Sequence, residues 1–138
     1  MTNTNRHRRQ EAMPLPPIKV IEEEMRRLNA LANLSVELFP RVSHFLAREM
    51  ERATVVTDDM DMHGVVRMSS RVSYRDDRTG ETREVMLVYP HEADIKLDRI
   101  SVLTPVGAAL IGLTVGQSIE FQTPGHQIRT LTVLDVSR

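Results

Sequence analysis

The chain has 138 residues, of which 41% are hydrophobic and 4% aromatic, and it contains no tryptophan and no cysteine. The length fits one domain, or one small domain with a helical appendage, whose core rests on aliphatic side chains and methionine. The net charge of −1 gives no overall field for nucleic acid or an anionic membrane, and the lack of cysteine excludes disulfides and thiol nucleophiles. No membrane span or signal peptide is recognisable, so we expect a soluble, cytoplasmic protein without a membrane partner.

Residues 1–17 are expected to form a flexible tail. Prolines at its end, in the run Pro14-Leu15-Pro16-Pro17, cannot enter a helix interior or a sheet ladder. The basic cluster Arg6-His7-Arg8-Arg9 could contact phosphate. Four residues in a nearly neutral chain attract phosphate only weakly, however, so we expect a solvated tail.

Residues 18–53 are predicted to form a short antiparallel helical hairpin. Apolar residues recur at steps of three and four from residue 18 to about 33, and again from Pro40 to about Ala53. The acidic run Glu22–Glu24 lies where the helix dipole favours anions, and we interpret it as a solvated helix face. The link between the helices is short, so their apolar stripes should pack together. We expect the hairpin tip at Ser35, Val36 and Glu37.

Residues 54–63 are expected to form an acidic linker. Its carboxylates and histidine are possible metal ligands: Asp58, Asp59, Asp61 and His63. Their spacing matches neither a calcium loop nor a paired-histidine zinc motif. We therefore expect a solvated linker and no metal site.

Residues 64–138 read as a sheet with one short helix. Alternation from residue 65 to 74 and a return at 82–89 predict a β-hairpin around a turn at 76–80. A strand at 98–103 leads to a helix that Pro105 opens and Gly112 ends. Strands at 118–122 and 128–136 then flank a turn at 123–125. The first β-hairpin also carries five arginines, which either form a basic strip for an acidic partner or keep an outer face soluble: Arg67, Arg71, Arg75, Arg78 and Arg83.

The segment ISVLTPVGAALIGLTVGQSIEFQTPG, residues 100–125, resembles the C-terminal domain of the Gre transcript-cleavage factors. It is more similar to the Rnk family, the regulators of nucleoside diphosphate kinase, and residues 65–72 and 87–90 match as well. The resemblance covers roughly the last half of the chain. It implies an α+β protein, in which the short antiparallel helical hairpin precedes an FKBP-like antiparallel sheet domain with one short helix, spanning residues 64–138.

The resemblance also implies a function. Gre factors insert a long coiled coil into the secondary channel of RNA polymerase, where acidic tip residues help to hold a catalytic magnesium ion. The tip here has one acid, Glu37, so we expect polymerase binding at the β′ subunit near that channel without stimulated transcript cleavage. Contact with DNA would be indirect, through polymerase, and the link to nucleoside diphosphate kinase would be indirect too.

The resemblance places the docking of the partner on the short helix and the residues on either side of it. The expected partner-binding residues are Thr104, Pro105, Val106, Gly107, Ala108, Leu110 and Gly112. The Gre pattern has basic residues within and just after this helix, where this chain has Ala108 and Leu113. The contact is therefore expected to be more apolar here than in the Gre factors.

We expect no catalytic residues and no cofactor, because no activated nucleophile or phosphate-binding loop is recognisable. Two other functions stay open. A prolyl isomerase or chaperone is compatible with an FKBP-like fold. Such sites depend on an apolar pocket lined by aromatic residues, however, and this chain has few aromatic residues. A self-associating structural module is compatible with the apolar helix stripes.

Overall fold

The structure, a computed structural model, describes residues 14–138, so most of the expected tail and its basic cluster lie outside the described residues. The last tail residues are tied to the fold. The Pro16 carbonyl accepts a hydrogen bond from Arg52 Nη1 at 2.5 Å, and the Pro17 carbonyl accepts one from Gln117 Nε2 at 3.0 Å. Residues 16 and 17 are therefore anchored to both the hairpin and the sheet.

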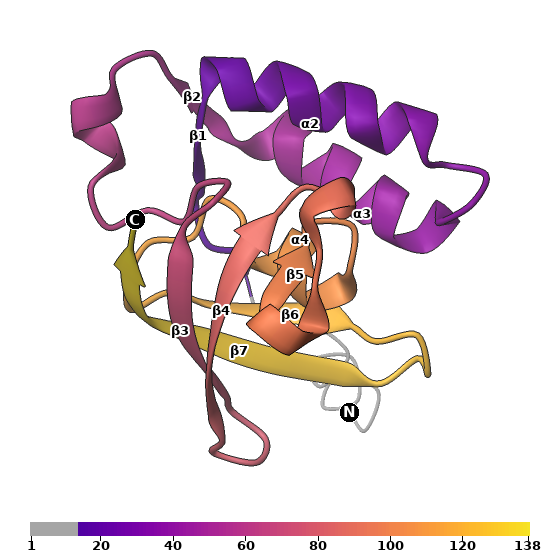
Figure 1. The fold of residues 1–138 in the computed structure, drawn as a ribbon, viewed down its shortest axis with the longest axis vertical. Coiled ribbons are helices and arrows are strands. Elements are labelled where there is room, and N and C mark those ends of the chain that lie inside the picture. Colours follow the sequence, from indigo (N-terminus) through magenta and orange to yellow (C-terminus); the bar gives the residue numbers. More distant parts are fainter. Residues whose placement is uncertain (1–13) are drawn as a thin grey trace, which may run out of the picture.

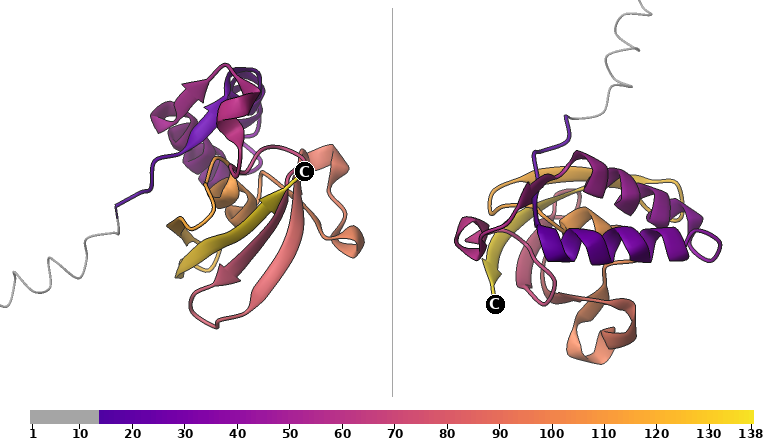
Figure 2. Two further views of the ribbon diagram at one scale, coloured as in Figure 1. Left: turned by 90° about the vertical axis from the view of Figure 1, so that its left-hand side faces the viewer. Right: turned by 90° about the horizontal axis from the view of Figure 1, so that it is seen from above.

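The expected hairpin consists of helices α2 (Glu22–Leu34) and α3 (Pro40–Arg52), which lie side by side in Figures 1 and 2. Helix α2 begins four residues later than predicted. The preceding strand β1 (Lys19–Ile21) pairs in parallel with β2 (Thr54–Val56), the segment that leaves the hairpin. The start of the predicted helix and the start of the predicted linker thus form a small sheet at the hairpin's base.

The main sheet has five strands in the order β5-β4-β3-β7-β6 and curls around the short helix (Figure 1). Its strands are β3 (Arg71–Asp76), β4 (Thr82–Val88), β5 (Arg99–Ser101), β6 (Ser118–Gln122) and β7 (Ile128–Ser137). All pairs are antiparallel except β4 with β5, which departs from the predicted antiparallel sheet. The chain crosses over between these two strands through residues 89–98, so it returns in the same direction.

The strand predicted from residue 65 starts only at Arg71. Residues before it form a turn, in which Ser70 N donates to the Arg67 carbonyl at 3.1 Å and Ser69 has a φ of 69°. This left-handed conformation interrupts the extended backbone despite the alternating sequence. The turn brings residues 67 and 68 to the hairpin.

Helix α4 (Pro105–Leu110) starts as predicted at proline, and the Thr104 side chain caps it by accepting a hydrogen bond from Gly107 N at 3.0 Å. One hydrophobic core joins this helix to the hairpin, through Leu28 and Leu46, and to the sheet, through Leu87. The predicted α+β arrangement is confirmed. Among residues 14–138, no helix is both long and apolar enough to cross a membrane.

A candidate docking groove beside the helical hairpin

An apolar groove of about 360 Å³ lies where helix α3 faces the start of α4 and strand β6. The hairpin contributes Phe39 and Phe45, and the sheet domain contributes Phe121, with Val42, Leu103 and Pro105 between them. These are all three phenylalanines of the chain. Composition alone indicates that aromatic residues are scarce, but the fold gathers the three phenylalanines at one place. Aromatic side chains supply much of the contact area and energy of protein interfaces.

The rim of this groove is cationic. Arg41 and Arg48 are exposed there, and no aspartate or glutamate is among the described residues that line it. Arg41 also contacts the ring of His126 at 3.1 Å, which links α3 to the turn between β6 and β7. An apolar floor with a positive rim fits a partner segment that is apolar in the middle and acidic at its ends.

The predicted docking residues divide into two groups. Thr104, Pro105 and Val106 are half-buried and reachable from solvent, and Pro105 lines the groove. The remaining four are buried, which corrects their assignment to an accessible surface: Gly107, Ala108, Leu110 and Gly112. Ala108 and Leu110 belong to the hydrophobic core. Gly107 lies against the backbone of Ser101, and Gly112 lies against Ile18. Docking on the first turn of α4 stays a prediction.

The predicted hairpin tip forms the turn between α2 and α3. Ser35 is buried there, Val36 is half-buried and Glu37 is exposed. The most exposed side chains at the tip are apolar, which the sequence did not predict: Leu34 and Leu38 are 84% and 80% exposed. Both leucines lie off the helix stripes, and that break in periodicity was the available signal. The tip is therefore an apolar surface with a single carboxylate.

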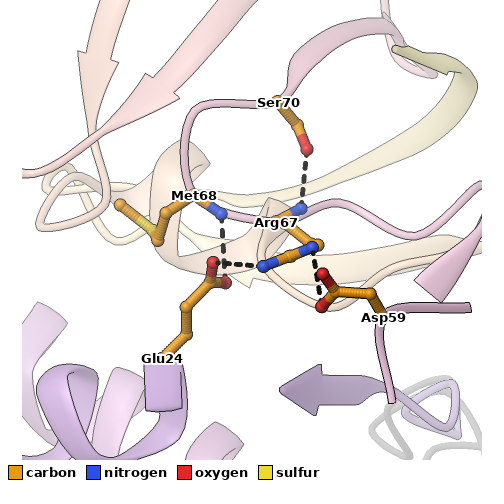
Figure 3. A network of polar contacts seen from close by, with 5 residues as sticks. All are labelled: Glu24, Asp59, Arg67, Met68 and Ser70. Carbon is orange, nitrogen blue, oxygen red and sulfur yellow. Dashed lines mark hydrogen bonds and ion pairs between the residues drawn. The ribbon is translucent and has the colours of Figure 1, made fainter. Parts of the chain in front are cut away.

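A polar network fixes the hairpin on the sheet domain (Figure 3). Glu24 is buried, and its carboxylate contacts Arg67 Nη2 at 3.2 Å and accepts a hydrogen bond from Met68 N at 3.3 Å. Arg67 also pairs with Asp59 at 3.4 Å. Glu24 is thus no part of a solvated helix face, because the turn before β3 brings a cation and an N–H to it. The contact therefore holds α2 against the sheet domain.

Arg27 and Tyr89 make a second contact between hairpin and sheet domain. The guanidinium of Arg27 lies 4.6 Å from the centre of the Tyr89 ring, within the range of a cation–π interaction. Burial raises the pKa of the Tyr89 phenol, although the charge of Arg27 opposes the shift. The phenol therefore stays protonated and neutral at physiological pH.

Two further features singled out from the sequence are the arginines of the β-hairpin and the acidic linker. Of the arginines in the β-hairpin, Arg75 pairs with Asp77 at 2.9 Å and Arg78 donates to Gln127 at 3.3 Å. Arg67 is turned toward Glu24, whereas Arg71 and Arg83 are exposed on β3 and β4, and a role of the basic strip in partner contact stays a prediction. In the expected linker, residues 59–62 form a 3₁₀ turn. No three histidine or carboxylate side chains converge as a metal site within the part of the chain that the structure describes.

Comparisons with known proteins agree with this architecture. Residues 61–138 match the family model described as transcription elongation factor, GreA/GreB, C-terminal. The chain is 35% identical over 124 residues to the regulator of nucleoside diphosphate kinase of Escherichia coli K12, covering 90% of this chain and 91% of that protein. It is 36% identical over 91 residues to the transcription elongation factor GreA of Syntrophobacter fumaroxidans, covering 66% and 58% of the two chains.

A solved structure gives the same result in three dimensions. The prokaryotic transcription elongation factor GreA/GreB from Nitrosomonas europaea superposes with a TM-score of 0.69 at 33% identity, covering 89% of this chain and 99% of that one. The match therefore includes the helical hairpin as well as the sheet domain. The chain belongs to the Rnk family of regulators of nucleoside diphosphate kinase, which shares its C-terminal domain with the transcription elongation factors GreA and GreB.

Proposed function

We propose that this protein is a non-enzymatic, cytoplasmic regulator of transcription that binds RNA polymerase at the β′ subunit, near the secondary channel, without stimulating transcript cleavage. Its relatives include proteins named as transcription elongation factors, which supports a polymerase partner. The observation that carries the proposal is the apolar groove with its arginine rim, placed where the hairpin meets the sheet domain.

The groove has the composition of an interface core. Phenylalanine and arginine are enriched at such cores, whereas lysine and acidic residues are depleted. Phe121 and Pro105 line the groove beside the accessible first turn of α4, where the family resemblance places docking. We infer that polymerase contacts this face, with the hairpin directed toward the channel entrance.

The hairpin supports the absence of cleavage chemistry. Each of its helices has 13 residues, so at 1.5 Å per residue the hairpin reaches only about 20 Å. Magnesium is usually held through one or two carboxylates together with water and substrate, and Glu37 at the tip is flanked by exposed leucines. The proposed action is to occupy the channel entrance or to compete with longer factors. It requires no cofactor or metal, and any effect on DNA or on nucleoside diphosphate kinase is indirect.

Replacing Phe121 with alanine is expected to weaken binding to core RNA polymerase by about tenfold or more, because it removes one of the three aromatic side chains that line the groove. Leu134→Ala is the matched control, since Leu134 is a partly exposed apolar residue on the adjacent strand β7 that does not line the groove. Affinity is measured by co-migration on native gels or by fluorescence anisotropy with labelled protein.

The same samples test the cleavage claim when a Gre factor and a stalled transcription complex are added. Binding together with suppressed cleavage would support the proposal. Stimulated cleavage would overturn the interpretation of the tip, and Glu37→Gln would then show whether that carboxylate is responsible. Absence of binding at micromolar concentrations would contradict the polymerase partner.

A prolyl isomerase is the second candidate, and one observation favours it. The sequence argument against it was aromatic scarcity, yet the three phenylalanines share one apolar groove. A proline-peptide assay with the wild type and Phe121→Ala decides this point. Turnover that falls in the variant would support isomerase activity, and turnover at the uncatalysed rate would exclude it.

A further inference from the structure

The crossover loop between β4 and β5 carries two apolar side chains into solvent. Ile95 is 87% exposed and Leu97 is 58% exposed, and the segment protrudes from the body of the protein in both views of Figure 2. Neither residue lines the groove beside α3. Both side chains are thus available to another molecule.

This loop has a fixed shape. Asp94 and Arg99 exchange two backbone hydrogen bonds of 3.0 Å, and the Asp94 carboxylate accepts a third from Lys96 N at 3.0 Å. Asp98 adopts a left-handed conformation and its N–H donates to the Ile95 carbonyl at 3.0 Å. An ordered loop loses little conformational entropy on binding, so it can present its apolar residues at low cost.

The charges on the loop complement those of the groove. Residues 91–98 contain three carboxylates and one lysine, and Asp94 and Asp98 lie on either side of the apolar pair. The groove has the opposite pattern, with Arg41 and Arg48 at the rim of an apolar floor and no carboxylate among its described lining residues. The two surfaces match in both polarity and charge.

We propose that the β4–β5 loop of one molecule binds in the groove beside α3 of a second copy of this protein. The contact joins two different surfaces, so each pair leaves one free loop and one free groove, and assembly proceeds head to tail. A molecule whose groove holds a loop cannot use that groove for another partner. Self-association therefore competes with polymerase for the groove. This competition rests on the proposed function, whereas the contact between two copies of the protein does not.

Sedimentation velocity of the purified protein over a wide concentration range tests this contact without polymerase. The wild type is expected to sediment faster as concentration rises, and added salt should oppose this because charges contribute. In the loop variant, Ile95→Ser is combined with Leu97→Ser. In the groove variant, Phe39→Asp places a carboxylate against the acidic loop. Aspartate is also a favoured N-cap residue, and Phe39 occupies that position of α3, so this variant should stay folded.

Each variant alone is expected to self-associate at least about tenfold more weakly than the wild type. An equimolar mixture of the two should form a dimer and nothing larger, because the groove variant retains its loop and the loop variant retains its groove. Val115→Ser, which removes an exposed apolar residue elsewhere, should behave like the wild type.

Three results would overturn the proposal. The first is a wild type that stays monomeric at all concentrations. The second is a mixture of the two variants that forms no dimer. The third is self-association that survives in the loop variant and is lost in Leu38→Ser, because contact would then run through the hairpin tip. Polymerase binding is measured separately with the loop variant, whose groove is intact, so failure of self-association and failure of the proposed function are told apart.

Discussion

Replacing Gly107 with alanine is expected to destabilise the protein by about 3 kcal/mol or more. An added Cβ would lie 2.1 Å from the backbone carbonyl oxygen of Ser101, far inside contact distance. That oxygen belongs to strand β5, and it also accepts a hydrogen bond from the Thr104 hydroxyl that caps α4. The clash cannot be relieved by a side-chain rotation, so helix and strand must move apart.

Gly125→Ala is the matched control for this substitution. The nearest atom to its added Cβ is Thr123 Oγ1 at 4.0 Å, an ordinary contact distance, so its effect should stay within about 0.5 kcal/mol. Urea unfolding followed by circular dichroism measures both variants. A Gly107→Ala protein as stable as the control would contradict the close approach of α4 to β5.

Replacing Met25 with aspartate should cost about 3–5 kcal/mol, because it places a carboxylate without a partner in the core. Met25 is buried within the core cluster, on the face of α2 that the helical periodicity predicts. Glu24→Ala should cost less, about 1–3 kcal/mol, because it leaves the Met68 N–H and one contact of Arg67 unsatisfied.

Glu23→Ala provides the control for both variants, since Glu23 is exposed on the same turn of α2 and should change stability by less than about 0.5 kcal/mol. Thermal unfolding at neutral pH should rank the three variants with Met25→Asp least stable, then Glu24→Ala, then Glu23→Ala. If Glu24→Ala and Glu23→Ala unfolded together, the buried network of Figure 3 would not contribute to stability. If Met25→Asp also unfolded at the same temperature as these two variants, the assignment of the buried face of α2 would be wrong.

Glu24 shows which features of helix α2 the periodicity of apolar residues predicts and which it does not. The spacing of apolar residues predicts which face of α2 meets the core, and Met25 and Leu28 are buried there. It does not reveal that Glu24 is buried as well, because its partner Arg67 lies 43 residues away and reaches it only through an irregular turn. An acidic residue at the start of a helix has an adequate local explanation in the helix dipole, which conceals the long-range one.

Elements whose signals are local were predicted closely. Helix α4 with its opening proline, and the strands β6 and β7 around their turn, lie where the sequence places them. Strand β1 was missed because Ile18 and Ile21 fit the helical stripe of α2 and because its partner β2 lies beyond the whole hairpin. The groove could not be derived either, since its phenylalanines come from two segments, the start of α3 and strand β6, that only the tertiary fold unites.

The pairing of β1 with β2 has a consequence for how this architecture can vary in length. Ile21 and Val56 are register partners, so the two ends of the hairpin lie side by side where it joins the rest of the protein. Whole helical turns added to both helices at the tip would lengthen the hairpin without disturbing the β1–β2 pair at its base. Long and short hairpins can therefore share one sheet domain, and the reach of such a protein becomes a property that changes independently of its docking face.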